Sequence, residues 1–169
     1  MRQVFIGLSV SNVFLLLGTF LLGLRPERFG GADRHILLAV LTCMLTCLVQ
    51  VVVFTFLSVS GRLISQAVHL GTLPPTPIET IRGLKRRTGR CLAGLALLLV
   101  LAVASGAAHW RSGAYAWPHF LLVSLFLAAH FPVLLLEWQV IDRTRHLVDE
   151  TMGAYRLARA NRQEAVSGS

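Results

Sequence analysis

The chain has 169 residues, of which 54% are hydrophobic and 14% charged, and its formal net charge is +8. This composition excludes an ordinary water-soluble domain, and four apolar stretches leave no room for a soluble catalytic domain. The excess of positive charge is typical of membrane orientation and of attraction to anionic lipid headgroups, so we do not expect nucleic acid as a partner.

The first apolar stretch covers residues 4–24 and begins almost at the N-terminus. About 20 apolar residues cross the hydrocarbon core of a bilayer as a helix. The stretch is longer than the apolar region of a secretory signal peptide, and no small-residue cleavage site follows it. We therefore expect an uncleaved membrane span, in which Asn12 joins neighbouring helices through hydrogen bonds.

The second apolar stretch, residues 36–60, is long for one crossing, so we expect its helix to tilt or to continue toward Leu70. The proline-rich segment 73–77 then breaks the helix. Within it, Thr76, Pro77 and Glu79 have the order of an N-cap, a first-turn proline and a capping-box glutamate. A new helix is predicted to begin at Thr76.

The third apolar stretch, residues 91–109, is rich in glycine, alanine and serine, which let membrane helices approach one another closely. The fourth, residues 120–140, continues into an apolar stripe spaced by seven, four and three residues: Ile141, Val148, Met152 and Tyr155. We expect a cytoplasmic helix over about 141–162 and a disordered tail at 163–169.

If each stretch crosses the membrane once, the 16 basic residues divide 12 to 4 between the two sides. Basic residues next to membrane spans stay on the cytoplasmic side. Both termini and a loop at 61–90 are therefore predicted to be cytoplasmic, in a bacterial inner membrane. The predicted fold is all-α: one integral membrane domain over residues 1–169, a four-helix bundle, N-in and C-in, with cytoplasmic helical extensions.

His130 lies about halfway through the fourth stretch, where an ionisable side chain marks a functional site by default. Residue counting puts it within about one helical turn of Gln50 in depth. Cys43, Cys47 and Gln50 share one helix face. The interpretations are a structural hydrogen bond between His130 and Gln50, a copper(I) or zinc site at Cys43, Cys47 and His130, or a quinone bound at His130 and Gln50.

Three further histidines lie at the opposite, outer end: His35 opens the second stretch, His109 closes the third and His119 opens the fourth. Two neutral imidazoles could hold a b-type haem, as in four-helix membrane cytochromes. Histidines at an interface that also carries Trp110 and Trp117 serve equally as amphipathic anchors. The sequence leaves both interpretations open.

Glu137, at the inner end of the fourth stretch, is expected to reach the interface or to pair with Arg62. The sequence contains no nucleophile elbow, phosphate-binding glycine loop or zinc-protease motif. We therefore expect no catalytic residues, and the sequence favours a protein that is not an enzyme.

The leading hypothesis is a non-catalytic accessory, anchoring or assembly subunit with no cofactor. It would bind another protein subunit, a second copy of itself or anionic membrane lipid through its basic cytoplasmic face. The docking residues expected on that face are Arg82, Lys85, Arg86, Arg87, Arg90, Arg156 and Arg159. The alternatives are an electron-transfer subunit that binds haem b or quinone, and a small-solute carrier or channel.

Overall fold

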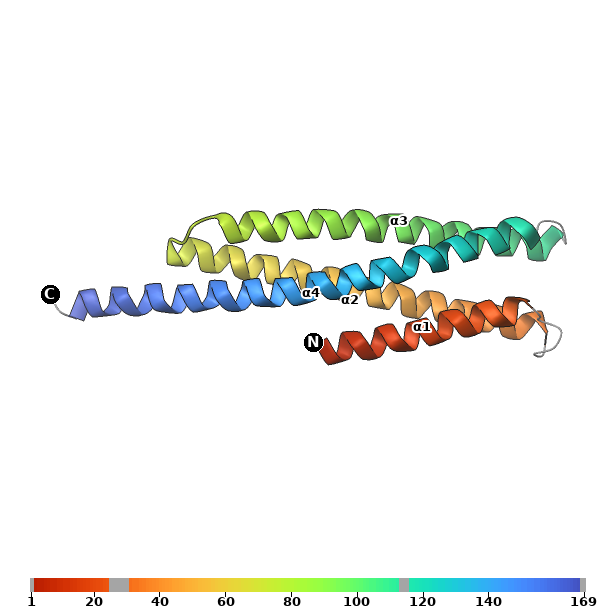
Figure 1. Ribbon diagram of the computed structural model, residues 1–169, viewed down its shortest axis with the longest axis horizontal. Helices are drawn as coiled ribbons and strands as arrows, with labels where there is room; N and C mark the ends of the chain where they lie inside the picture. Colours follow the sequence, from red (N-terminus) through yellow and green to blue (C-terminus); the bar gives the residue numbers. More distant parts are fainter. Residues whose placement is uncertain (1, 25–30, 113–115, 168–169) are drawn as a thin grey trace. The chain divides into compact units, whose positions relative to one another are not determined.

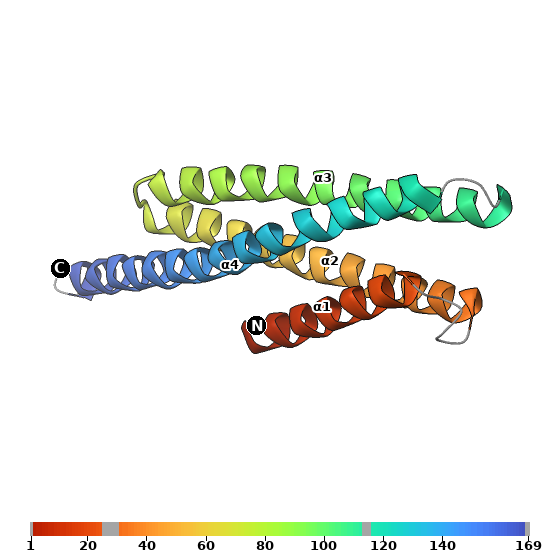
Figure 2. The same ribbon diagram turned by 45° about the vertical axis from the view of Figure 1, so that its right-hand side comes forward.

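The computed structural model describes residues 2–24, 31–112 and 116–167, and in these ranges the chain forms four helices and no strand. The helices are α1 (Arg2–Leu24), α2 (Ala32–Gly71), α3 (Thr76–Ser112) and α4 (Ala116–Ser167), as Figures 1 and 2 show. Each contains an 18-residue window apolar enough to cross a membrane. The predicted all-α fold with four membrane-competent helices is confirmed.

A tight turn at residues 72–75 joins α2 to α3 (Figure 1). Thr72 has a positive φ of 52°, and the amide of Leu73 donates to the carbonyl of Val68 at 3.0 Å. This is the geometry of a Schellman motif, which usually places glycine where Thr72 stands. The helix therefore extends well past the apolar stretch and ends at Gly71, beside the predicted limit of Leu70.

Helix α3 begins at Thr76, the predicted residue, although the hydrogen bonds of the predicted capping box between Thr76 and Glu79 are not among its contacts. The backbone amides of Ile78 and Glu79 both donate to the carbonyl of Pro75, at 2.9 and 3.3 Å. Pro77 stands in the first turn, where its missing amide proton would have had no intrahelical acceptor. The turn thus ends α2, and the carbonyl of Pro75 accepts the first hydrogen bonds of α3, all within four residues.

The described chain divides into two compact units. Unit 1 comprises Met1–Val52 and Arg90–Leu135, and unit 2 comprises Val53–Gly89 and Leu136–Ser169. Helices α2, α3 and α4 contribute to both units, whereas α1 belongs to unit 1 alone. In unit 1, the segments of the four helices are 20 to 23 residues long, close to the length that crosses a hydrocarbon core.

Unit 1 is apolar outside and partly polar inside. Its packed centre contains Leu16, Leu95 and Phe126. Large apolar side chains more than 60% exposed point outward: Phe14, Leu37, Met44, Leu97, Val100, Trp117 and Leu135. An apolar exterior of this extent suits lipid rather than water, because water penalises every exposed apolar surface.

Unit 2 is built from the second half of α2, the first part of α3 and the second part of α4. Its buried apolar residues include Leu57, Ile64, Ile81 and Val140. Helix α4 remains helical to Ser167, beyond the predicted end near residue 162, so residues 163–167 are helix rather than disordered tail. Just before these residues, Arg162 contacts the α2–α3 turn, where it donates to the hydroxyl of Thr72 at 2.6 Å.

Candidate functional site

His130 is buried in unit 1 and is held by Asn12 of α1. The Nδ2 atom of Asn12 lies 3.1 Å from Nε2 of His130. Because an amide nitrogen can only donate, Nε2 accepts and the imidazole proton resides on Nδ1. The ring also stacks on Phe126 of the same helix, with centroids 5.4 Å apart.

Asn12 also binds α2, so one amide joins three helices. Thr46 donates to Oδ1 of Asn12 at 2.9 Å, and it also lies within 2.8 Å of the carbonyl of Thr42. Closer to the C-terminal end of α1, the hydroxyls of Thr19 and Thr42 lie 2.7 Å apart. These contacts confirm that Asn12 serves as a polar link between helices.

The other residues predicted around His130 lie elsewhere. Nε2 of Gln50 is buried without a hydrogen-bond partner in the described part of the chain, so it makes no bond to His130. Cys43 is half-buried and Cys47 is exposed. Residues 2–24, 31–112 and 116–167 contain no group of three or more His, Cys, Asp or Glu side chains able to hold a metal ion. The structure thus pairs His130 with Asn12, not with Gln50 or the cysteines.

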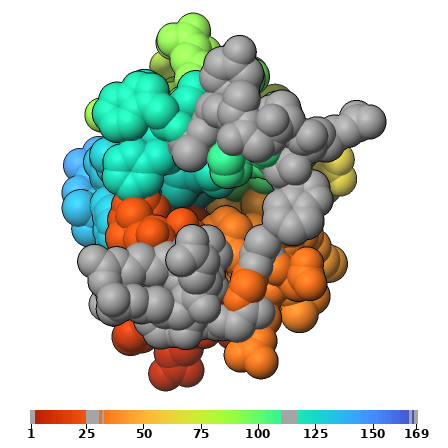
Figure 3. Space-filling model, turned by 90° about the vertical axis from the view of Figure 1, so that its right-hand side faces the viewer, coloured from red at the N-terminus to blue at the C-terminus, as the bar shows by residue number. Residues whose placement is uncertain are grey.

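His35 and His119, by contrast, lie close together in unit 1. They stand near the N-terminal ends of α2 and α4, and these helix ends lie on the face that Figure 3 shows. Their ring centroids lie 6.5 Å apart, and the two ring planes form an angle of 80°. Nδ1 of His119 donates to the carbonyl of Ala102 at 3.0 Å and lies 3.2 Å from the hydroxyl of Ser105. A carbonyl only accepts, so the Nε2 atom of His119 carries the lone pair.

Each of these two rings sits against a glycine of the preceding helix. A Cβ atom added at Gly23 would lie 2.8 Å from Cε1 of His35, and one added at Gly106 would lie 2.9 Å from Cε1 of His119. Both distances are shorter than real side-chain contacts, so any other residue would displace the imidazole. The glycines are required by the rings that cover them.

The two helical hairpins of unit 1 repeat this arrangement. Gly23 precedes His35 by twelve residues, and Gly106 precedes His119 by thirteen. The residues after each histidine also correspond, Ile-Leu-Leu at 36–38 and Phe-Leu-Leu at 120–122. Each hairpin therefore offers one imidazole from the start of its second helix, seated on a glycine near the end of its first.

Other histidine and aromatic side chains lie near the same end of unit 1. His109 is half-buried near the end of α3. Phe20, Phe120 and Trp117 form a series of stacked rings, with centroids 5.8 Å apart for the first pair and 6.4 Å for the second. Aromatic side chains of this kind gather at membrane interfaces. Arg25 and Arg28, two of the four basic residues on the smaller side of the 12-to-4 division, lie outside the described residues.

Among the described residues, Glu137 is buried rather than exposed and forms no ion pair with Arg62, so that expectation was wrong. It is only 1% exposed within unit 2, and its Oε2 atom is buried with no hydrogen-bond partner among the described residues. Arg62 is exposed. The reason is the rotation of α4, which directs Glu137 into the interior with Val140 and Ile141.

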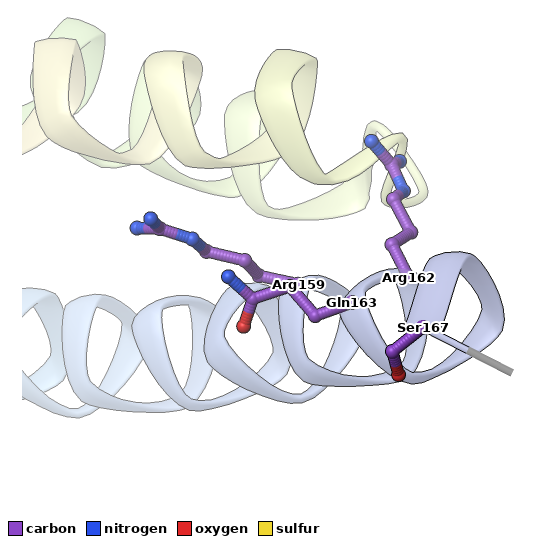
Figure 4. Close-up of a pocket in the computed structure, with 4 residues that line it drawn as sticks. All are labelled: Arg159, Arg162, Gln163 and Ser167. Atoms are coloured by element: carbon purple, nitrogen blue, oxygen red, sulfur yellow. The ribbon is translucent and has the colours of Figure 1, made fainter.

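The predicted docking residues are nearly all exposed: Arg82, Arg86, Arg87, Arg90, Arg156 and Arg159. Lys85 is half-buried instead, with its ammonium group 5.3 Å from the centre of the Phe54 ring. An open hollow lies near the end of α4 and is lined by Arg159, Arg162, Gln163 and Ser167 (Figure 4). The side chain of Arg162 extends from it toward the α2–α3 turn. The surface of unit 2 is therefore basic along α3 and, on α4, over residues 156–162.

Comparisons with protein-family models, with curated proteins and with solved structures found no match to the chain. The class that the structure itself defines is an all-α protein with four helices competent to cross a membrane. The residues that sequence reasoning missed are Gly23, Gly106 and Thr46. The repeated glycine–histidine spacing of the two hairpins was the one available signal for the first two.

Proposed function

We propose that the protein is a non-catalytic membrane subunit, anchored by unit 1, that docks an acidic protein partner through unit 2. Unit 1 crosses a bacterial inner membrane, and both termini and unit 2 face the cytoplasm. The 12-to-4 division of basic residues supports this orientation. The contrast between an apolar exterior in unit 1 and exposed arginines in unit 2 supports the division of roles.

The observation that carries the proposal is the length of α4 in unit 2. Residues 136–167 are continuously helical. At 1.5 Å per residue this segment is about 48 Å long, so its distal half lies beyond the reach of headgroups if α4 leaves the membrane steeply. There it exposes Arg156, Arg159 and the side chain of Leu157, which is 69% exposed. A basic surface with an apolar centre suits an acidic protein.

The basic residues of α3 favour a different role. Arg82, Arg86, Arg87 and Arg90 are exposed and stand with one acidic residue, Glu79, in the fifteen positions that precede the third apolar stretch. Each basic residue near an anionic membrane surface contributes about 1 kcal/mol of attraction. In the proposed orientation this segment holds the inner ends of the helices against the headgroups.

The test is affinity purification from native membranes with charge-reversal variants. The pair Arg156→Glu and Arg159→Glu should abolish a stoichiometric, salt-sensitive association, whereas Arg86→Glu with Arg87→Glu should leave it intact. Loss in the α3 variant alone would indicate lipid binding rather than a partner on α4. A wild-type protein that purifies alone, or an association that survives removal of residues 141–169, would contradict the proposal.

A further inference from the structure

We propose that His35 and His119 are the two axial ligands of a b-type haem iron, held between α2 and α4 in unit 1. This site is independent of the docking surface on unit 2. Four observations support the proposal: the distance between the rings, the number of protein ligands, the tautomer of His119 and the glycine that contacts each ring.

The distance between the rings matches ligation of one metal atom from two sides. A bond from imidazole nitrogen to a metal is about 2.0–2.1 Å long, which puts the ring centre about 3.2 Å from the metal. Two imidazoles on opposite sides therefore place their centroids about 6.4 Å apart. The observed separation is 6.5 Å. The 80° angle between the ring planes is compatible with this, because each plane has only to contain the axis through the metal.

The number of ligands distinguishes haem from a bare ion. A protein site for zinc or copper normally supplies three or four side-chain ligands. The described residues offer only these two imidazoles here, because no third His, Cys, Asp or Glu side chain joins them in a metal-binding group. A haem needs two axial ligands and brings the other four nitrogen atoms itself.

The hydrogen bonds of His119 prepare it for ligation. Its Nδ1–H donates to the carbonyl of Ala102, as metal-bound histidines commonly do to backbone carbonyls. That bond fixes the ring and leaves Nε2 unprotonated. On the facing helix, the Nδ1 atom of His35 is buried with no hydrogen-bond partner in the part of the chain that the structure describes. A buried polar atom of this kind is costly unless a ligand compensates for it.

The surroundings also suit a flat apolar ligand. Gly23 and Gly106 keep both imidazoles close to the helix backbones, which limits their freedom to rotate. The stacked rings of Phe20, Phe120 and Trp117 add aromatic surface in the same part of unit 1. With both axial positions filled by histidine, a haem iron is suited to one-electron transfer, as in membrane cytochromes.

The experiment is an absorption spectrum of the full-length protein, produced with added haem precursor and purified in detergent. The wild type should bind about one haem per chain and show the sharp, low-spin bands of bis-histidine ligation on reduction. His35→Ala and His119→Ala should each lose those bands. The exposed residues His69 and His146 provide matched controls, and their alanine variants should keep the spectrum.

A second pair of measurements separates loss of a ligand from loss of folding. Circular dichroism should show unchanged helix content in His119→Gly, and added imidazole should restore the low-spin spectrum. Folded wild-type protein that takes up no haem would overturn the assignment. So would bands that persist in both ligand variants, bands lost in His109→Ala instead, or a stoichiometric metal without porphyrin.

Discussion

Nδ2 of Asn12 on α1 lies 3.1 Å from Nε2 of His130 on α4, and neither side chain is more than 2% exposed. Through Thr46 the same amide reaches α2. A polar link of three helices in an otherwise apolar bundle fixes which faces meet, because any other rotation would leave these groups unpaired.

Replacing Asn12 by alanine should therefore destabilise unit 1. Hydrogen bonds between membrane helices contribute about 0.6 kcal/mol on average and up to about 1.7 kcal/mol. We expect a loss toward the upper value, because the change leaves both Thr46 and His130 without Asn12. Denaturation in mixed micelles measures it, and Ser11→Ala at an exposed position of the same helix provides the control. Equal stability of the two variants would contradict the assigned role.

The contact between His119 and Gly106 predicts that two glycines of α3 differ in how much an alanine substitution changes stability. Gly106→Ala places a methyl group 2.9 Å from Cε1 of the ring, whereas no described atom lies within 4 Å of a Cβ at Gly94. We expect Gly106→Ala to cost about 1–3 kcal/mol through overpacking, and Gly94→Ala to be neutral or stabilising. The same denaturation assay compares them. Tolerance of alanine at both positions would mean that the imidazole is not held in place.

For Glu137 we predict a substitution that increases, rather than decreases, the free energy of unfolding. Its buried Oε2 has no hydrogen-bond partner among the described residues, so the fold bears the cost of removing that oxygen from water. Glu137→Leu, which keeps a similar volume, should raise the free energy of unfolding by about 1–3 kcal/mol. Glu150→Leu at an exposed position should change it little. A destabilised Glu137→Leu protein would show that the carboxyl group makes a favourable contact.

Arg162 should control the end of α4. It donates to the hydroxyl of Thr72 at 2.6 Å and to the carbonyl of Leu70 at 3.4 Å. Arg162→Ala removes exposed hydrogen bonds, so the global cost should be below about 1 kcal/mol. Hydrogen exchange of residues 156–167 should nevertheless become faster, and Arg156→Ala should leave it unchanged. Unaltered exchange in Arg162→Ala would mean that the contact does not order this segment.

The sequence was sufficient for the four helices and for the start of α3. Hydropathy depends on local composition, and the start of α3 at Thr76 depends on the neighbouring prolines and threonine, so neither needs knowledge of packing. The same holds for Asn12, whose polarity within an apolar stretch predicts a hydrogen-bonded link.

The rotation of each helix about its own axis could not be predicted from the sequence. Residue counting put His130 and Gln50 at similar depth, but depth does not say which face of a helix meets which neighbour. His130 instead binds Asn12, and Glu137 points inward rather than toward Arg62. The meeting of His35 and His119 depends on the pairing of two hairpins far apart in the sequence.

The central claim is that unit 1 lies in lipid and unit 2 in water, and cysteine labelling along α4 tests it most directly. Leu125, Leu135, Arg145 and Leu157 are all exposed on this one helix, so only their surroundings should differ. In a protein whose native cysteines Cys43, Cys47 and Cys91 are replaced by alanine, each position is changed to cysteine and treated with a water-soluble maleimide. We expect rapid labelling at 145 and 157, from the cytoplasmic side, and little at 125 and 135. Equal labelling at all four positions would contradict the account.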